Sequence, residues 1–318
     1  MMTRLPLFLL CCLVILVLIL TEAVEEPQKR GISLPKGVGE YDEHFFNDHE
    51  MLRPIFDALV TEMYKLLPRG KRLSSVLDVG CGTGYLVEAW RSETPLSKSY
   101  CVEGSSNAAP HWPAIFARRY YQTLDLQAPT AVQQIPKTDV VTSFEVAEHL
   151  PPSHADRFIQ LLVHHSPAMV FFGAATPDQD QGKNPSHVNE NTLGYWIDQF
   201  RHQQYIIDFE GTAFFRYNLL KNPVYVQYFG QAWWYVKNAL IFVPQRNQTD
   251  VDQAIIHHPE EINLLSPNFL DIGKGRLEHL WKRDWTEFAT LFYQEQDKAA
   301  KRIILQKQQE YDDGDDEL

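Results

Sequence analysis

The stretch that most limits the fold of this chain is SSVLDVGCGTGYLVEAW, residues 74–90. The apolar run at 76–79 is typical of a short buried strand, and the apolar residues after the glycines recur at the spacing of a helix face. Glycines at positions 80, 82 and 84 separate the two patterns. Glycine permits unusual backbone angles and lets a ligand approach the main chain, and the first N–H groups of the helix add donors. The stretch therefore predicts a nucleotide-binding strand–turn–helix unit.

The spacing of these glycines argues against a dinucleotide ligand. A dinucleotide fingerprint would need its third glycine at position 85, where it allows close packing of helix and strand over a pyrophosphate. That position holds Tyr85. The observed G-x-G-x-G pattern suits a ligand that has no pyrophosphate and whose polar tail lies over the turn.

Composition excludes some classes of protein. The chain has 318 residues, of which 44% are hydrophobic, which is sufficient for one large domain with appendages. The formal net charge is -12, and no stripe of Lys and Arg is present that could follow a phosphate backbone. We therefore expect no nucleic-acid partner.

The N-terminal segment favours a secretory protein. One Arg precedes an uncharged apolar run of sixteen residues over 5–20, and small residues follow around Ala23. The run is short for a membrane span, so we predict that 1–23 is a cleaved signal peptide. The alternative is an uncleaved signal anchor, and only then would the chain contact a membrane. Residues 24–40 are polar and contain prolines and glycines, which is typical of a linker.

The C-terminal segment predicts where the chain resides. Residues 311–318 form an acidic tail that ends in DDEL, which resembles the KDEL and HDEL signals that a retrieval receptor reads. Asn247 begins an N-Q-T glycosylation sequon. Together with the N-terminal segment, these features predict a glycoprotein of the endoplasmic-reticulum lumen that binds the retrieval receptor; the alternative is a membrane-anchored protein of the secretory pathway.

Strand and helix patterns alternate between these ends, which predicts a parallel sheet covered by helices. We expect strands at 75–79, 99–103, 118–126, 139–144, 168–176, 204–211 and 238–244. We expect helices at 41–67, with a break near Pro54, and at 84–92, 153–165, 189–201 and 222–237. The first of these would cover the ligand pocket. Residues 246–310 are predicted to be a helical extension, in which a polar helix at 276–310 packs as a cap.

The order of four motifs, VLDVGCGTG, CVEGS, LDL and DVVTSFEVAEHLP, resembles the class I S-adenosylmethionine-dependent methyltransferases, in particular the type-11/type-23 group. The resemblance covers residues 41–245. It implies a Rossmann-like α/β fold with a seven-stranded, mostly parallel sheet, helices on both faces and an antiparallel last strand. It also implies that S-adenosylmethionine binds over the carboxyl ends of the first strands.

The resemblance assigns roles to several polar residues. Glu103, which ends the second strand, would accept both ribose hydroxyls, and Asp78 would lie near the cationic methionine moiety. Asp125 would accept from the adenine amino group, although an Asp that caps a turn is the alternative. The other predicted cofactor contacts are Gly80, Cys81, Gly82, Gly84, Phe144 and Glu145, the last two at the methionine end.

Methyl transfer requires mainly alignment of the acceptor with the sulfur–methyl bond, and a hydroxyl acceptor also requires a base. The loops after the fourth and fifth strands supply His149, in EVAEHLP, and His187, in an HVNE…YW element that resembles one found in some family members. Such loops face the crevice where ligands bind. His187 is the predicted base, with a structural or helix-capping role as the alternative. His149 is the second candidate, although EHL also occurs in members whose acceptors need no base. We predict no metal ligands.

The cysteines at 81 and 101 belong to neighbouring predicted elements. A disulfide would require Cα atoms within about 7 Å of each other. Because family members often have a small residue at the position of Cys81, we predict a free buried thiol instead.

These features predict a methyltransferase of the secretory pathway that methylates a small molecule or a glycan, at a hydroxyl group. One alternative is a catalytically silent binding or scaffold protein that retains the cofactor fold. A second is a protein methyltransferase of the endoplasmic-reticulum lumen. The absence of an NPPY-like element after the fourth strand, where FEVAEH stands, argues against the second alternative.

Overall fold

The computed structural model describes residues 49–68, 73–114, 119–245 and 278–315. The N-terminal apolar run, the predicted linker, the sequon at Asn247 and the last three residues of the DDEL end lie outside these residues. None of the helices in the described ranges combines the length and the apolar character that a membrane span requires.

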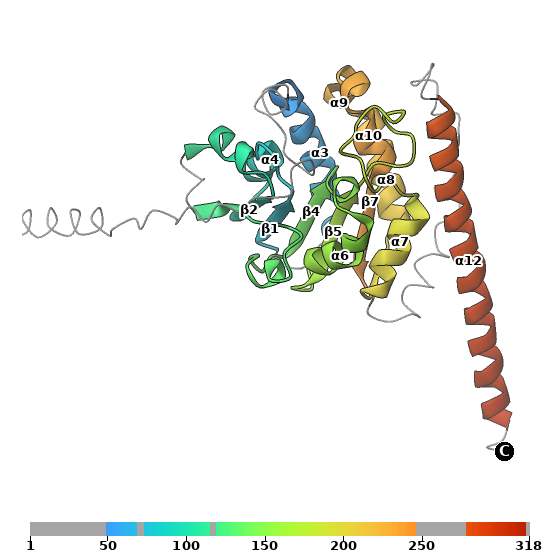
Figure 1. Cartoon of the computed structure of the whole chain (residues 1–318). Coiled ribbons are helices and arrows are strands. Elements are labelled where there is room, and N and C mark those ends of the chain that lie inside the picture. Colours follow the sequence, from blue (N-terminus) through green and yellow to red (C-terminus); the bar gives the residue numbers. More distant parts are fainter. Residues whose placement is uncertain (1–48, 69–72, 115–118, 246–277, 316–318) are drawn as a thin grey trace, which may run out of the picture. The chain divides into compact units, whose positions relative to one another are not determined.

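A seven-stranded sheet forms the centre of the fold, in the order β3-β2-β1-β4-β5-β7-β6 (Figure 1). Its strands are β1 (Ser75–Val79), β2 (Lys98–Glu103), β3 (Tyr121–Thr123), β4 (Val140–Phe144), β5 (Met169–Gly173), β6 (Tyr205–Ile207) and β7 (Leu240–Pro244). β7 runs antiparallel to both β5 and β6, and the remaining pairs are parallel. Every residue of β1, β4 and β5 is buried, as expected of parallel strands covered on both faces. The predicted fold class is confirmed.

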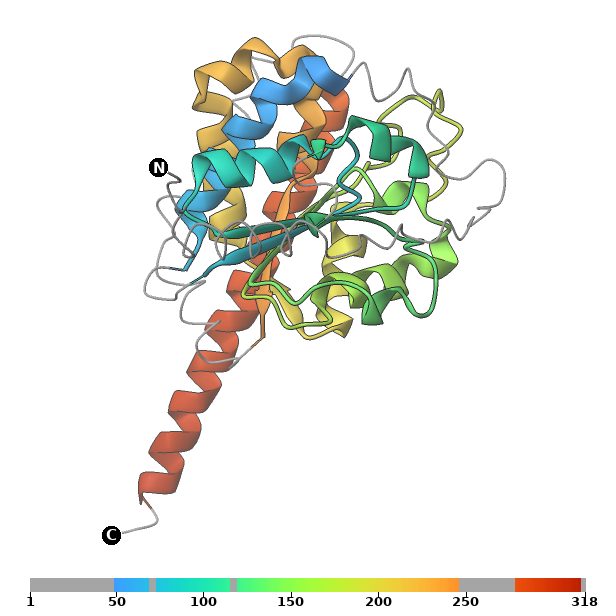
Figure 2. The same ribbon diagram turned by 90° about the vertical axis from the view of Figure 1, so that its left-hand side faces the viewer.

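Helices cover both faces of this sheet, as Figures 1 and 2 show. One face carries α3 (Arg53–Leu66), α4 (Tyr85–Glu93), α8 (Phe209–Lys221), α9 (Pro223–Gln227) and α10 (Phe229–Asn238), and the other carries α6 (Ala155–Val163) and α7 (Leu193–His202). Short 3-10 helices at His49–Leu52, Ser106–His111, Ala131–Gln133, Ala147–His149 and Pro152–His154 join the larger elements. The helix α3 begins beside Pro54, which agrees with the predicted break.

Segment 204–211 differs from its predicted structure. The strand β6 ends at Ile207, and α8 begins at Phe209. Asp208 lies between them and accepts a hydrogen bond from the Gly211 amide at 2.8 Å, so that it caps the helix. The prediction of a strand through residue 211 was therefore wrong, and α8 was not predicted. The predicted helix 222–237 is divided at Tyr228 into α9 and α10, and α10 is kinked at Ala232, which leaves helical geometry.

The C-terminal helix α12 (Glu278–Asp315) packs against α7 and α10. Phe288 and Phe292 are buried, and each ring centroid lies 5.4 Å from that of Phe209 in α8. The side chain of Glu287 accepts a hydrogen bond from the Gly194 amide at the start of α7. The helix continues to residue 315 and so includes the first part of the predicted acidic tail. The predicted cap helix is thus part of the folded core at its N-terminal half.

The topology places a ligand-binding crevice at one edge of the sheet. The strand order reverses between β1 and β4, where the chain crosses from one half of the sheet to the other. In open α/β sheets, ligands bind outside the carboxyl ends of the strands at such a point. The loops that follow β1, β2, β4 and β5 converge there.

Candidate functional site

A cavity of about 430 Å³ lies at the carboxyl ends of the strands, within the size range typical of small-molecule sites. Its walls come from the loops after β1 to β5, from the N-terminal part of α3 and from α10. Of the residues predicted from sequence, it is lined by Asp78, Gly80, Cys81, Gly82, Glu103, Asp125, Phe144, Glu145, His149 and His187. Gly84 is not among the lining residues; it is the N-cap of α4. The predicted helix at 41–67 contributes Met51, Leu52 and Phe56 to the wall.

The loop after β1 requires glycine where it passes close to other residues. Gly80, with a φ of 78°, donates its amide to the carbonyl of Val102 at 2.7 Å. A Cβ at this position would lie 2.2 Å from a methyl group of Val146. Gly84, with a φ of 82°, would place a Cβ 2.4 Å from the ring of Tyr121. Both left-handed conformations are available to glycine without strain, and they turn the loop back over β2.

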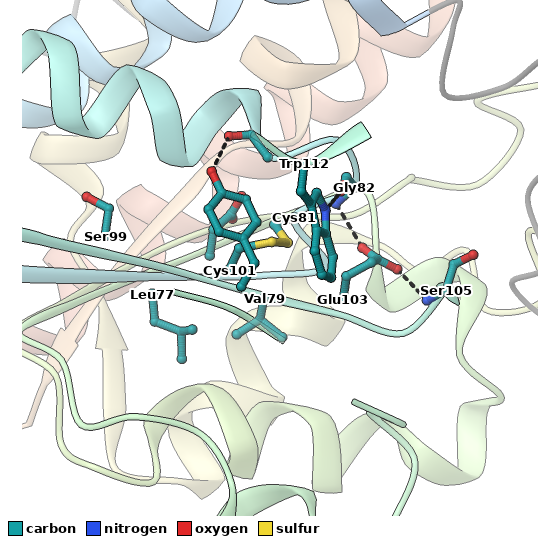
Figure 3. Close-up of a disulfide and its surroundings, with 12 residues drawn as sticks. Leu77, Val79, Cys81, Gly82, Ser99, Cys101, Glu103, Ser105 and Trp112 are labelled. Carbon is teal, nitrogen blue, oxygen red and sulfur yellow. Dashed lines mark hydrogen bonds between the residues drawn. A yellow bond between two sulfur atoms is a disulfide. The ribbon is translucent and has the colours of Figure 1, made fainter. Parts of the chain in front are cut away.

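The turn brings Cys81 close to Cys101, and the two residues form a disulfide with Cα atoms 5.5 Å apart (Figure 3). The prediction of a free thiol at Cys81 was wrong. The amides of Gly80 and Cys81 both donate to the carbonyl of Val102, so the loop folds directly over the residue that follows Cys101. The free-thiol prediction relied on the small residue that family members often have at the position of Cys81. That preference does not indicate how closely the loop after β1 approaches β2.

Glu103 ends β2 and holds the glycine loop. Its Oε2 accepts the Gly82 amide at 2.8 Å, and its Oε1 accepts the Ser105 amide at 2.7 Å (Figure 3). Each carboxylate oxygen has a second lone pair, so the group retains acceptors for a ligand in the cavity. Burial raises the pKa of Glu103, and the backbone hydrogen bonds oppose that shift. The Glu103 side chain can therefore hold the glycine loop and accept hydrogen bonds from ligand hydroxyl groups at the same time.

Asp78 is buried at the floor of the cavity. Its Oδ1 accepts a hydrogen bond from the Thr142 hydroxyl at 2.7 Å. Burial raises the pKa of Asp78 to about 7, against that hydrogen bond and with a contribution from Glu103. A cationic ligand beside this carboxyl group would be bound favourably, because a nearby positive charge stabilises the ionised form of the carboxyl group.

Asp125 combines the two roles that the sequence left open. Its Oδ1 accepts the amide of Gln127 at 2.9 Å, which caps a turn, and the residue also lines the cavity. The second oxygen of a carboxylate that caps a turn with one oxygen remains an acceptor. A ligand contact at Asp125 is therefore compatible with its structural role and remains a prediction.

Phe144 ends β4, Glu145 follows it, and both line the cavity. Glu145 has a φ of 56°, and its carboxylate accepts from the Asn238 amide group at 2.9 Å and from the Gln179 amide group at 2.7 Å. Phe144 packs edge-on against Tyr235, with ring centroids 5.9 Å apart. The left-handed conformation of a non-glycine residue here is a local strain that these contacts hold in place.

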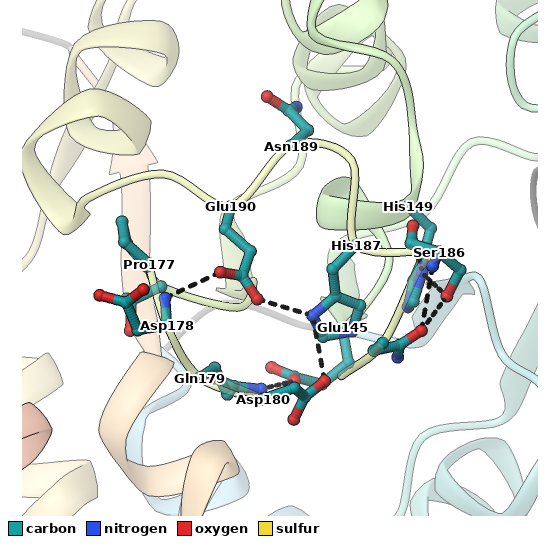
Figure 4. A network of polar contacts seen from close by, with 12 residues as sticks. Glu145, His149, Pro177, Asp178, Gln179, Asp180, Ser186, His187, Asn189 and Glu190 are labelled. Atoms are coloured by element: carbon teal, nitrogen blue, oxygen red, sulfur yellow. Dashed lines mark hydrogen bonds and ion pairs between the residues drawn. The ribbon is translucent and has the colours of Figure 1, made fainter. Parts of the chain in front are cut away.

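The two predicted histidines lie side by side, with ring centroids 4.7 Å apart (Figure 4). His187 Nδ1 lies 2.9 Å from Oε1 of Glu190 and 3.2 Å from Oδ2 of Asp180. His149 Nδ1 lies 3.2 Å from the carbonyl oxygen of Ser186. Burial, together with the nearby His187, lowers the pKa of His149 to about 4, so this ring is neutral at physiological pH.

A main-chain contact brings the two histidine segments together. The carbonyl oxygen of Glu148 accepts the amides of Val188 at 2.9 Å and Asn189 at 3.0 Å. The Asn189 side chain, in turn, donates to the carbonyl of Ala147. The HVNE segment is thus fixed against the EVAEHL segment, and both histidines reach the cavity from separate loops.

A family model described as a methyltransferase domain matches residues 48–207, which is just over half of the chain. The chain belongs to this methyltransferase family. The matched region contains the glycine loop, Glu103 and both histidine segments. The family model describes a domain that transfers methyl groups, so the chain is a methyltransferase.

Several solved structures show similarity to the methyltransferase. A SAM-dependent methyltransferase from Archaeoglobus fulgidus has 17% identity and a TM-score of 0.41, over 51% of this chain and 74% of that one. Magnesium protoporphyrin IX methyltransferase from Synechocystis, with bound SAH, has 18% identity and a TM-score of 0.38, over 54% and 81%. The plantazolicin methyltransferase BamL has 12% identity and a TM-score of 0.44, over 64% and 89%. A search of curated proteins finds no match.

Several residues of the methyltransferase site were not predicted from its sequence. They are the hydrogen-bond partners of Glu145 and the cavity residues Asp180, Asn184, Gln231, Trp234 and Tyr235. Gln179 and Asp180 follow β5 in a polar loop, and loops at that edge generally face the ligand, so their position was a usable signal. The contributions of α10 had no such signal, because its aromatic pattern is equally typical of core packing.

Proposed function

We propose that this methyltransferase acts in the secretory pathway and methylates a hydroxyl group of a small molecule or a glycan. The observation that carries the proposal is the His187–Glu190 pair, which reaches the same cavity as Glu103 and Asp78. One cavity thus holds groups suited to the methyl donor and a group suited to removing a proton from an acceptor.

The donor would occupy the side of the cavity formed by β1, β2 and β3. Glu103 accepts the ribose hydroxyls, and Asp125 accepts the adenine amino group. Asp78, near the methionine end, favours the positive charge of the sulfonium and the amine. Burial raises the pKa of Asp78, Glu103 and Glu145 alike, and a cationic donor relieves the cost of ionising these groups in the cavity.

The acceptor would approach from the side formed by the loops after β4 and β5. A histidine whose Nδ1 is bound to a carboxylate is held in one orientation and presents Nε2 as its base. His187 has this arrangement through Glu190. The acceptor oxygen attacks the methyl carbon, the hydroxyl proton passes to His187, and the sulfur–methyl bond breaks with its electron pair on sulfur.

The secretory location is supported by four features of the chain. The apolar N-terminal run resembles a signal peptide, and the DDEL end resembles a retrieval signal. The disulfide between Cys81 and Cys101 is a bond that persists in oxidising compartments and is rare in the cytosol. The sequon at Asn247 agrees with the same compartment.

Methyl transfer to fractionated glycans and small molecules, measured with radiolabelled S-adenosylmethionine, tests the reaction. We expect label in a hydroxyl-bearing fraction as an alkali-stable ether. The Glu103→Ala variant should bind the donor about 10- to 100-fold more weakly in calorimetry, because charged hydrogen bonds to the ribose are lost. Label found only in protein amino or imidazole groups would overturn the acceptor assignment.

Removal of Asp315 to Leu318 from a tagged chain tests the location. We expect the shortened chain to appear in the culture medium and the full chain to remain in the cell with high-mannose glycans. A chain that carries alanine at Asn247 controls for the glycan. Equal retention of the full and shortened chains would exclude a retrieval role for the DDEL end.

A further inference from the structure

Two cavity-lining histidines, His149 and His187, converge with the fully buried Glu148 in a way that proton removal alone does not require. One ligand-type atom from each of Glu148, His149 and His187 lies within 4.8 Å of the others. These residues come from two segments, the loop after β4 and the HVNE segment, which the main-chain contacts to Glu148 hold together. Nitrogen and oxygen donors at this separation match the arrangement around a single cation.

On each histidine ring, the Nδ1 atom already has a hydrogen-bond partner. His187 Nδ1 contacts the carboxylate of Glu190, and His149 Nδ1 contacts the carbonyl oxygen of Ser186 (Figure 4). Histidines that bind a metal usually donate their second ring N–H to a carboxylate or a carbonyl, which fixes the ring and its tautomer. On both rings the metal ligand would thus be Nε2.

Glu148 supplies an independent indication that a ligand belongs here. Its side chain is 0% exposed, and neither carboxylate oxygen has a hydrogen-bond partner within the described part of the chain. Buried carboxyl groups are normally paired, hydrogen-bonded or bound to a metal. Within the described part of the chain, the Glu148 carboxyl group is influenced by the backbone of Ala175, by its own backbone and by the Glu145 carboxyl group, none of which is a cation.

We propose that Glu148, His149 and His187 bind one divalent first-row transition-metal cation at the acceptor side of the cavity. Two imidazoles and one carboxylate are a donor set suited to Zn²⁺ or Mn²⁺. Three protein ligands leave coordination positions for water or an acceptor, as in catalytic rather than structural metal sites. A second group, Asp180, His187 and Glu190, also comes within 4.8 Å, but in it the carboxylates occupy the Nδ1 side of His187.

The role of the metal in catalysis, unlike the site itself, rests on the proposed function. A hydroxyl bound to the cation loses its proton more readily, and the carboxylate of Asp180, which lines the cavity, takes that proton. The oxygen forms a bond to the methyl carbon, and the sulfur–methyl bond breaks with its electron pair on sulfur, which leaves S-adenosylhomocysteine. His187 then acts as a ligand of the metal in place of acting as the base.

Calorimetry with Zn²⁺ and with Mn²⁺ on the mature full chain, after removal of metals by a chelator, tests the site. We expect one equivalent to bind, and we expect Glu148→Gln and His149→Gln each to weaken binding roughly 100-fold or more, beyond the loss typical of outer partners. Glu62→Gln, which changes a buried glutamate outside the site, should bind as the unchanged chain does. The two site variants are independent, so that one of them still decides if the other fails to fold.

The outcomes separate this proposal from the proposed function. No uptake of either metal by chelator-treated protein that still binds S-adenosylmethionine overturns the site. Loss of binding in Asp180→Asn with retention in Glu148→Gln also overturns it, in favour of the second group. Equal methyl transfer with and without metal overturns the catalytic role of the cation and leaves the proposed function standing. Metal binding without transfer to any hydroxyl supports the site and contradicts the proposed function.

Discussion

Two buried groups of ionisable side chains lie beside the carboxyl end of β5, and they differ in how completely they are paired. The first joins Lys237 of α10 to Asp284 of α12 at 2.6 Å, and Thr176 contacts both. The second is the group formed by Glu148, His149 and His187. The polar atoms of the first group contact one another, whereas the carboxylate of Glu148 has no hydrogen-bond partner among the described residues.

The first group has the character of a structural connection. The side chains of Lys237 and Asp284 are 0% and 1% exposed, and Arg283 adds a hydrogen bond to Asp284 at 2.7 Å. Burial alone would raise the pKa of Asp284, but Lys237 and the hydrogen bonds bring it below its usual range. Buried charges with this degree of pairing fix the position of α12 against the core and offer nothing to a ligand.

The second group, formed by Glu148, His149 and His187, has the character of a functional site. Burial and the nearby Glu145 raise the pKa of Glu148 well above its usual range, so the fold maintains a costly carboxyl group beside a cavity. Proteins retain such groups chiefly where a ligand or a reaction uses them. Equal burial thus marks a structural role in one group and a functional role in the other, and the pairing of the polar atoms distinguishes them.

The largest expected effect comes from breaking the structural pair. Lys237→Met leaves Asp284 buried without its cation, and we expect the free energy of unfolding to fall by about 3–5 kcal/mol in urea titrations. The double variant Lys237→Met/Asp284→Leu removes both charges and should recover most of this loss. A cost below about 1 kcal/mol for the single variant would show that the pair does not hold α12.

The next effect should appear in activity rather than stability. We expect His187→Gln to reduce methyl transfer about 10²-fold, whether the ring acts as base or as ligand, while the free energy of unfolding changes by less than about 1 kcal/mol. His202→Gln, on the exposed end of α7, is the matched control. A large loss of stability in the first variant would place His187 with the structural group.

A smaller effect concerns the donor side and depends on pH. Burial raises the pKa of Asp78 to about 7, so the carboxyl is protonated below that pH, and a cationic donor must expel the proton to bind. The affinity for S-adenosylmethionine should therefore decrease about tenfold for each pH unit below 7. Calorimetry from pH 5.5 to 8 measures this, and Asp78→Asn should flatten the profile. The same slope in the variant would assign the pH dependence to another carboxyl group.

The smallest effect is expected for an exposed ion pair of α12, which serves as a comparison for the buried pair of Lys237 and Asp284. Arg201 of α7 approaches Glu295 of α12 at 3.5 Å, and its side chain is 45% exposed. We expect Arg201→Ala to change the free energy of unfolding by less than about 0.5 kcal/mol, because exposed ion pairs are screened by water. A loss close to that of Lys237→Met in the same titration would contradict the contrast between buried and surface contacts of this helix.

The sequence predicted the parts of the molecule that depend on local patterns. The buried strands β1, β4 and β5, the turn at the three glycines and the acid at Glu103 all follow from spacing and residue type. The helix α8 was missed, because IIDFEG reads as a strand unless Asp208 is recognised as a cap. The kink of α10 at Ala232 was also missed, because alanine is a good helix former and its residue type gives no signal of a kink.

Contacts between distant segments could not be predicted in this way. The pairing of Lys237 with Asp284, and that of Glu145 with Gln179 and Asn238, depends on how loops and helices converge in space. The motif EVAEHL indicated the neighbourhood of the site but did not indicate that Glu148 is fully buried, with a carboxylate that has no hydrogen-bond partner in the described ranges. Burial of a polar residue is a property of the fold, and one sequence carries little information about it.

The bridge between Cys81 and Cys101 connects the loop that contains Gly82 to the strand that ends in Glu103. In the proposed donor site, oxidation of the two thiols and occupation by the methyl donor therefore act on the same few residues. By thermodynamic linkage, the factor by which the closed bridge changes donor affinity is the factor by which bound donor changes the resistance of the bridge to reduction. With the donor bound as proposed, the supply of methyl donor and the thiol balance around the enzyme are therefore coupled.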